Sequence, residues 1–221
     1  SHYCHPDAIS AAATLSVPAP LPITDIDGNT YNTVGIGTQL WMKENLKTTK
    51  YSNGEIIGTT TTPTQDINGE SSPKYQWAYA GNESNAVTYG RLYTWYAVTD
   101  SRNVCPTGWH VPTTDEWTTL TNILGGEVGT GGALKETGTA HWPSPNALAT
   151  NAVGFTGLPG GYRSGTIFGA FGYGAQWWTT TEYDVTVVIY RSLSYNNNNV
   201  NRNNIGNVFG LSVRFVKNSG K

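Results

Sequence analysis

The sequence predicts an α+β domain in which short strands and a few helices are joined by irregular loops. Three observations support this prediction: one well-capped amphipathic helix, several strand-like runs broken by glycine, and no regular alternation of strands and helices. The length of 221 residues suits one large domain with a terminal extension. A chain of this size buries roughly 70% of its unfolded surface, so its core needs no dense disulfide framework.

The first 22 residues differ from the rest in composition. Pro18, Pro20 and Pro22 favour extended backbone over helix. We therefore predict an N-terminal extended arm or linker over residues 1–22 and one domain over residues 23–221. The first residues lack the basic and apolar regions of a secretory signal, so we expect any export signal to have been removed.

A turn-forming stretch follows the arm. Asp25, Asp27 and Asn29 are typical of a turn and are spaced like the start of a calcium loop. The twelfth position of such a loop requires an acidic side chain, and this position is Ile36. We therefore expect no calcium at this turn.

Two segments are predicted as helix. Residues 90–99 place apolar side chains at helical spacing. Residues 114–124 are better marked, because Thr113 and Glu116 form a capping-box pattern. A buried stripe and a terminating glycine complete the second helix: Trp117, Leu120, Leu124 and Gly125. Upstream, residues 82–84 match a glycosylation sequon, a short pattern that chance also produces.

Short strands are predicted where apolar runs are bounded by glycine, namely at residues 154–158, 172–178, 185–195 and 210–216. Alternation along the third run places Tyr190, Ser192, Ser194 and Asn196 on one face, and Ile189, Arg191, Leu193 and Tyr195 on the other. In the last run, Leu211, Val213 and Phe215 share an inward face and anchor the segment before them.

Charge and composition exclude several classes of partner. Charged residues make up 13% of the chain, against about 25% in average soluble proteins, and the formal net charge is −2. No basic patch fits nucleic acid, and no apolar run is long enough to span a bilayer, so we expect neither nucleic-acid binding nor membrane insertion. The uncharged polar surface and the few Met and Cys residues suit an extracellular location.

The sequence contains no recognisable catalytic or metal-binding motif. The four histidines show no paired metal spacing, and a hydrogen-bonded structural role is expected for His110. Cys4 and Cys105 fit either one disulfide or two separate thiols. We therefore predict that the protein is not an enzyme and requires no cofactor or metal.

The C-terminal part is unusually rich in asparagine. Eight of the twelve residues in 196–207 are Asn, although Asn favours neither strands nor helices. One interpretation is a solvated polar loop. Because Val200, Ile205 and Phe209 interrupt the tract, we favour a structured display surface, with Arg202 as a framework residue that bonds loop carbonyls. The nearby pair Trp177 and Trp178, with Tyr183, is read as core in preference to a sugar-stacking platform.

Several motifs together resemble the Fibrobacter succinogenes major paralogous domain family, in order and from about residue 23 to residue 217. They are DIDGNTY at 25–31, QLWMKENL at 39–46, GRLYTWY at 90–96, CPTGWHVPT at 105–113, LPGGYR at 158–163, WWTTTE at 177–182 and GLSVR at 210–214. The resemblance implies a C-type lectin-like fold, similar to that of formylglycine-generating enzymes, in which the terminal strands pair and two helices flank short twisted antiparallel sheets. Those enzymes use a cysteine pair, whereas Phe215 stands where many relatives have a cysteine, so their chemistry is not expected.

The asparagine-rich segment also resembles the variable region of proteins diversified by retroelements, in which template adenines are mutated. Asn codons begin with two adenines, so the resemblance implies that residues 190–209 are a variable region near its template state. We predict ligand contacts from Tyr190, Ser192, Ser194, Asn197, Asn198, Asn199, Asn201, Asn203, Asn204, Asn207 and Phe209.

The expected function is therefore an extracellular, cell-surface or virion module that binds a protein or glycan ligand through this segment. One alternative is a structural subunit of a surface fibre or phage tail that self-assembles through the N-terminal arm. An enzyme related to formylglycine-generating enzymes is the less favoured alternative.

Overall fold

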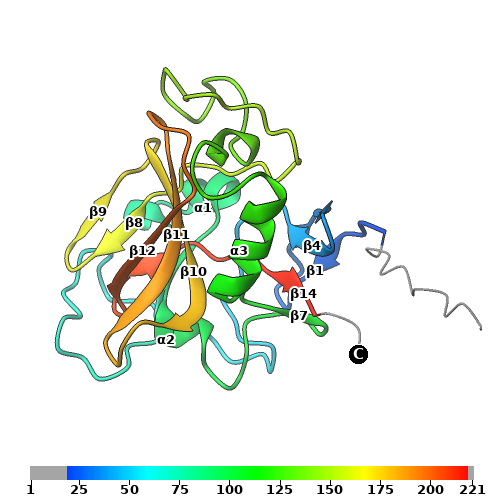
Figure 1. Ribbon diagram of the computed structural model, residues 1–221. Coiled ribbons are helices and arrows are strands. Elements are labelled where there is room, and N and C mark those ends of the chain that lie inside the picture. Colours follow the sequence, from blue (N-terminus) through cyan, green and yellow to red (C-terminus); the bar gives the residue numbers. More distant parts are fainter. Residues whose placement is uncertain (1–18, 219–221) are drawn as a thin grey trace, which may run out of the picture.

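The computed structural model describes residues 19–218 (Figure 1). The predicted arm lies almost wholly outside the described residues and stays a prediction. The described part contains three short α-helices and is otherwise mostly β, as the α+β prediction requires. The helices are α1 (Glu83–Tyr89), α2 (Trp95–Val98) and α3 (Thr114–Ile123), and two 3-10 turns are η1 (Tyr79–Gly81) and η2 (Gly131–Ala133).

The strands form four small antiparallel sheets, with the orders β1-β2, β3-β4-β14-β7, β5-β6-β13-β8-β9 and β10-β11-β12. Helix α3 lies beside β10 and β11 (Figure 1). The strand bounds are β1 Ile23–Thr24, β2 Thr30–Tyr31, β3 Thr33–Ile36, β4 Gln39–Met42, β5 Gln76–Trp77, β6 Leu92–Thr94, β7 Trp109–His110, β8 Tyr162–Ser164, β9 Ile167–Gly169, β10 Gly174–Glu182, β11 Val187–Ser194, β12 Asn201–Gly206, β13 Gly210–Leu211 and β14 Val216–Lys217.

The C-terminal segment, residues 210–217, connects three of these sheets. Strand β13 lies between β6 and β8, and β14 lies between β4 and β7. Between them, Ser212 donates its N–H to Gln176 and accepts from the N–H of Trp178, both at 3.1 Å, which ties the segment to β10. The prediction of one continuous strand over 210–216 was therefore wrong. The whole segment from 210 to 216 is buried, so its backbone groups find partners in different sheets.

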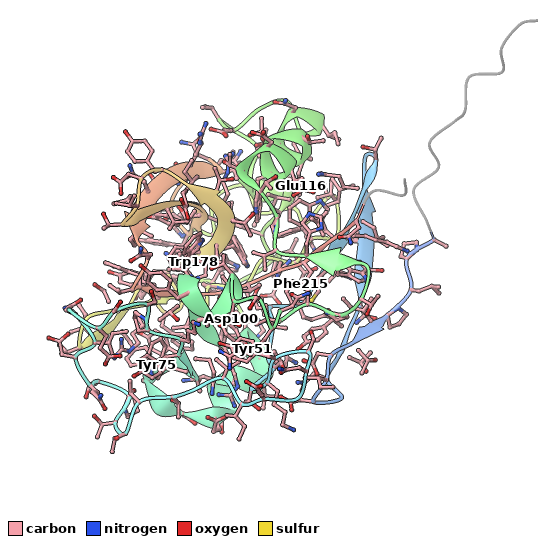
Figure 2. The ribbon with its side chains drawn as sticks, turned by 90° about the horizontal axis from the view of Figure 1, so that it is seen from below. Tyr51, Tyr75, Asp100, Glu116, Trp178 and Phe215 are labelled. Atoms are coloured by element: carbon pink, nitrogen blue, oxygen red, sulfur yellow. The ribbon has the colours of Figure 1, made fainter. Side chains whose placement is uncertain are left out.

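Strand β10 separates two hydrophobic clusters. Trp178 belongs to one cluster with Phe215, and Trp177 belongs to the other with Trp117. Both tryptophans of β10 are at most 1% exposed, and Trp178 and Phe215 lie within the body of the molecule (Figure 2). This confirms the interpretation of the tryptophan pair as core, whereas Tyr183 is 66% exposed.

A buried polar network joins these elements at the centre. The side-chain oxygen of Asn45, Oδ1, accepts from Trp177 Nε1 at 2.8 Å and from Arg214 Nε at 2.9 Å. The Arg214 guanidinium also donates to the main-chain oxygens of Phe155 and Thr156, and it lies over the Phe155 ring at 4.1 Å. Arg214 is 1% exposed, so these acceptors replace the water that its charge loses on burial.

The same network explains why residues 154–158 form no strand, contrary to the prediction. Their carbonyl groups at Phe155 and Thr156 point to Arg214, and Gly157 makes only a single bridge with Lys135. These two carbonyl oxygens accept from the Arg214 guanidinium and are therefore not available for pairing with a neighbouring strand.

The predicted helix over 90–99 was wrong in its first half, and α1 was missed. Leu92–Thr94 is the strand β6, and only Trp95–Val98 is helical. Pairing with β5 and β13 overrides the helical spacing of the apolar side chains there. Gly90 ends α1 with φ at 76°, and a Cβ on it would lie 2.6 Å from Asn45 Cβ.

Helix α3 confirms the capping prediction. Thr113 Oγ1 accepts from the Glu116 N–H at 3.2 Å, and the Glu116 carboxylate accepts from the Thr113 N–H at 2.8 Å. The other Glu116 oxygen contacts His110 Nε2 at 2.7 Å, and His110 Nδ1 contacts Asn218 at 2.5 Å. The hydrogen bond to Glu116 raises the pKa of His110, and burial opposes the rise. His110 therefore has the structural role that the sequence predicted.

Loss of the Arg214 donor should destabilise the whole domain. Arg214→Met leaves the buried Phe155 carbonyl and the half-buried Thr156 carbonyl without this donor, which costs about 1–3 kcal/mol each. We expect the free energy of unfolding, measured in urea, to fall by about 2–6 kcal/mol. Arg202→Met, at an exposed arginine of β12, is the matched control and should change it by less than about 0.5 kcal/mol. Equal urea midpoints for the two variants would contradict the central role of Arg214.

The His110–Glu116 contact predicts a pH dependence of stability. Because the folded pKa of His110 is raised, its stabilising effect is complete below the unfolded value of about 6.5 and is lost as the pH rises through the folded pKa. Glu116→Gln keeps a capping side chain but removes the charge. The decrease in the free energy of unfolding, as the pH rises from about 6.5 through the folded pKa of His110, should therefore be smaller in this variant than in wild type. Asp115→Asn changes the exposed neighbouring carboxylate and should retain the wild-type slope. The same slope in Glu116→Gln and wild type would refute the assignment.

Candidate functional site

One face of the sheet β10-β11-β12 is packed along its length. The other face is packed at Trp178 and Val188 and becomes accessible beyond them, at Tyr190 and Ser192. Along β11, Ile189, Arg191 and Leu193 are buried, while Tyr190 and Ser192 are half-buried. This confirms the predicted alternation. It arises because successive side chains of a strand point to opposite faces.

The register of β12 completes the accessible face. Asn203 lies opposite Tyr190, and Asn201 lies opposite Ser192, so these side chains share one side of the sheet. We define the outer face as Tyr190, Ser192, Ser194, Asn201 and Asn203. The direct contacts among them are few: Asn203 Nδ2 lies 3.4 Å from Ser192 Oγ.

The packed face is fixed to α3 by a buried arginine. Arg191 donates to the Thr118 hydroxyl at 3.0 Å and to the Thr114 carbonyl at 3.2 Å, and it forms an ion pair with Glu127. Arg191 is 0% exposed. Its hydrogen bonds hold β11 against α3, which fixes the position of the strand that carries the outer face.

The loop before β12 is held by its own asparagines. Asn198 Nδ2 donates to the Gly129 carbonyl at 2.6 Å, and Asn199 Oδ1 accepts from the Gly129 N–H at 3.1 Å. Asn198 Oδ1 also accepts from the Gly132 N–H. A Cβ on Gly132 would lie 1.8 Å from the Leu148 carbonyl oxygen, so only glycine fits this approach. Asn197, Asn198 and Asn199 are half-buried, and this part of the tract is an ordered loop in contact with residues 129–132.

A buried lysine holds the first half of this loop. Lys135 Nζ donates to the carbonyls of Ala147 at 2.7 Å, Asn197 at 3.0 Å and Ser194 at 3.1 Å. Burial lowers the pKa of Lys135 to about 8, while the three oxygens favour its charged form. The role predicted for Arg202, bonding loop carbonyls, therefore belongs to Lys135. Arg202 is exposed on β12, and its side chain makes no hydrogen bond within the described residues.

The remaining predicted contacts lie elsewhere. Asn204 is opposite Ile189, on the other side of the sheet from the outer face, beside a shallow hollow of about 280 Å³. Asn207 is 6% exposed, and its amide donates to the Tyr96 hydroxyl at 2.8 Å. We assign Asn207 to the framework, because its amide is already occupied. Phe209 is half-buried beside a deeper pocket.

That pocket opens next to the outer face and has a volume of about 380 Å³. Its lining comes from five strands, β8, β10, β11, β12 and β13, and from the turn between the last two: Tyr162, Ser164, Gln176, Tyr190, Ile205, Phe209 and Leu211. Sequence reasoning missed Tyr162, Ser164 and Gln176. The one available signal in the sequence was the LPGGYR motif, which includes Tyr162. The other residues come together through strand pairing between distant segments, which the local sequence does not predict.

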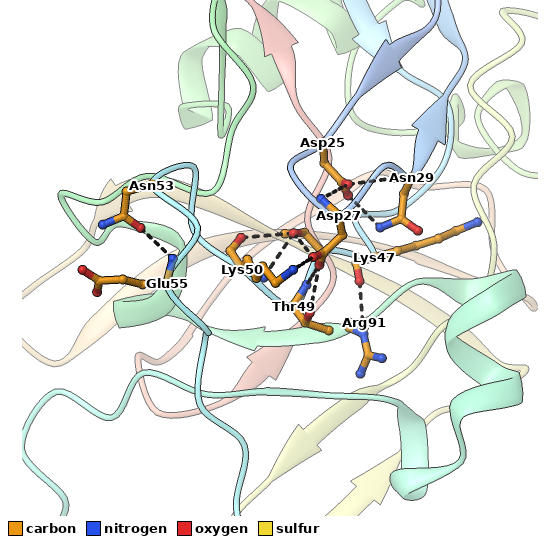
Figure 3. Close-up of polar contacts among 10 residues, drawn as sticks. Asp25, Asp27, Asn29, Lys47, Thr49, Lys50, Asn53, Glu55 and Arg91 are labelled. Carbon is orange, nitrogen blue, oxygen red and sulfur yellow. Dashed lines mark hydrogen bonds and ion pairs between the residues drawn. The ribbon is translucent and has the colours of Figure 1, made fainter.

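The Asp25–Asn29 turn is occupied by the protein's own donors (Figure 3). Asp25 Oδ1 accepts from the N–H groups of Asp27 and Asn29, and Asp27 Oδ2 accepts from the Thr49 N–H at 2.6 Å. Burial opposes ionisation of Asp27, but bonds from Thr49 and Lys50 outweigh it and lower its pKa to about 2. Across residues 19–218, no three His, Cys, Asp or Glu side chains group as metal ligands.

The proposed pairing of the two cysteines stays a prediction, because Cys4 is outside the described residues. Cys105 is 3% exposed, and burial raises the pKa of its thiol. Within the part of the chain that the structure covers, none of the helices has the length and apolar character that a membrane crossing requires.

The fold and the site define an α+β domain of short antiparallel sheets with a half-exposed polar strand face. The family model described as the Fibrobacter succinogenes major domain matches residues 34–217, and the chain belongs to this family. This confirms the family predicted from the motifs. No curated protein and no solved structure matches the chain.

Replacing Lys135 should loosen the loop of residues 194–200. Lys135→Met removes three donated bonds, and we expect hydrogen exchange at the Asn199 and Val200 amides to become about tenfold faster or more. Lys217→Met, at an exposed lysine of β14, is the control and should leave these rates unchanged. Unaltered exchange in Lys135→Met would show that the loop holds its conformation without the lysine.

Proposed function

We propose that this domain is an extracellular ligand-binding module whose outer face contacts a protein or glycan. The observation that carries the proposal is that the two faces of β11 differ in burial. Its buried side chains bind α3 and the core, while Tyr190 and Ser192 share the opposite face with the side chains of β12. Ser192, Asn201 and Asn203 make few internal contacts, whereas Tyr190 also packs against the core.

The chemistry of the face suits recognition without a metal or cofactor. Amides and hydroxyls offer both donors and acceptors, and an aromatic ring adds apolar area at low entropic cost. The Tyr190 hydroxyl is protonated at neutral pH, as tyrosine ordinarily is, and can donate. Burial raises its pKa further. Nothing in this role requires catalysis.

We further propose a C-type lectin-like fold and diversification of residues 190–209 by a retroelement. The pairing of β4 with β14, from opposite ends of the domain, supports the fold. The asparagine tract and the motif resemblance support diversification. Self-assembly through residues 1–22 stays an alternative, and gel filtration after deleting them would reveal it as a smaller assembly.

Binding should depend on the outer face and not on the far side of the sheet. We expect Asn201→Ala with Asn203→Ala to weaken binding to immobilised glycans and cell-surface proteins at least tenfold, because both amides lose their ligand bonds. Asn204→Ala, on the opposite side of the same strand, is the matched control and should bind as wild type. Equal loss in both variants, or in neither, would reject the outer face as the site.

The neighbouring DNA tests diversification separately. We expect a near-copy of the codons for residues 190–216 beside a reverse transcriptase gene. Its differences should fall at adenines in the codons for Tyr190, Ser192, Asn201 and Asn203. Differences concentrated at Arg191 or Leu193 would contradict the proposal, because those side chains are buried.

A further inference from the structure

The pocket beside the outer face has the size and the walls of a small-ligand site. Its volume of about 380 Å³ lies in the range of about 300–1,000 Å³ that is usual for such sites. Strand β8 supplies one wall and strands β10 and β11 supply another. Because β13 pairs with both β6 and β8 and Ser212 is bonded to β10, the walls are held at a fixed distance.

The lining determines the charge of the ligand. None of the seven lining residues is acidic or basic: they are two tyrosines, one phenylalanine, two aliphatic residues, one serine and one glutamine. A charged ligand would lose its water here and gain no counter-ion. The pocket therefore fits a neutral ligand.

Gln176 adds a requirement for a hydrogen-bond donor. Its side-chain carbonyl oxygen is buried and has no hydrogen-bond partner among the described residues. Buried polar atoms are paired in the great majority of folded proteins. A ligand hydroxyl could donate to this oxygen, and Ser164 offers a second polar group on the facing strand.

The aromatic rings suit a flat ligand with an apolar face. The rings of Tyr162 and Phe209 lie 6.5 Å apart at 39°, and Tyr190 stands on the adjoining strand. A sugar ring combines such a C–H face with hydroxyls at its edge, which matches rings beside an amide and a hydroxyl.

From these observations we propose that the pocket binds one neutral sugar residue, the terminal residue of a glycan. This inference rests on the proposed function and specifies its ligand class. Tyr162, Ser164, Gln176 and Leu211 lie outside residues 190–209. The pocket is thus anchored by residues outside the diversified segment, and the outer face forms its variable rim.

The test uses the full chain and methyl glycosides of glucose, galactose, mannose and N-acetylglucosamine. Saturation-transfer NMR and calorimetry should detect binding of at least one glycoside by wild type, with a dissociation constant near about 1 mM. Gln176→Met keeps the length of the side chain but removes the acceptor, and should weaken binding at least tenfold. Asn204→Ala should leave it unchanged.

Ser164→Ala is the second pocket variant and is informative if Gln176→Met does not fold, since its smaller change should also weaken binding severalfold. The inference would be overturned if wild type bound none of the four glycosides at about 10 mM, ten times the expected dissociation constant. So would wild-type affinity in both pocket variants.

The failure of this inference is separable from failure of the proposed function. If macromolecular binding is lost in the Asn201 and Asn203 double variant but is insensitive to Gln176→Met, the outer face is the site and the sugar pocket is refuted. If binding is insensitive to both changes, the proposed function fails as well.

Discussion

The structure depends most on the bonds that Arg214 makes at its centre. Its guanidinium meets Asn45 and the carbonyls of residues 155 and 156, and it stacks on Phe155. An unpaired buried charge would cost several kcal/mol, and here oxygen atoms and a ring face offset that cost. Because Asn45 and residues 155–156 belong to two segments far apart in sequence, the position of one arginine fixes both of them against the C-terminal segment.

Buried cations that bond main-chain carbonyls also fix the conformation of long loops elsewhere in the structure. Lys135 bonds carbonyls of the asparagine loop, and Arg163 bonds the carbonyls of Pro63 and Gln65 while it lies over Trp77 at 4.0 Å. Arg191 binds α3 in the same way. A chain with only 13% charged residues has thus placed several cations inside, where they order irregular backbone. The loops gain a defined conformation without sheet or helix.

This internal bracing has a consequence for the surface. Arg191 and Leu193 hold β11 on one face, while on the other face Ser192 is half-buried with few contacts and Tyr190 packs against the core only in part. Variation of the outer face is then compatible with a constant core. The neutral aromatic pocket next to it combines side chains of β8, β10 and β13 with others from β11 and β12, so the proposed sugar contact and the proposed variable rim can belong to one binding surface.

The sequence by itself determined the features that depend on neighbours along the chain. The capping box at Thr113, the alternation along β11 and the core position of Trp177 and Trp178 all follow from local spacing and apolar character. The family was also evident from ordered motifs, and the model match over residues 34–217 confirms it.

Only the tertiary structure decided how the candidate site is divided. Strand register places Asn201 and Asn203 beside Tyr190 and turns Asn204 to the opposite side, and burial makes Asn207 a framework residue. The split of residues 210–216 between two sheets, and the strand that replaced half of a predicted helix, have the same cause. Each depends on hydrogen-bond partners that lie far away in sequence, and no local pattern specifies which partner a backbone group will find.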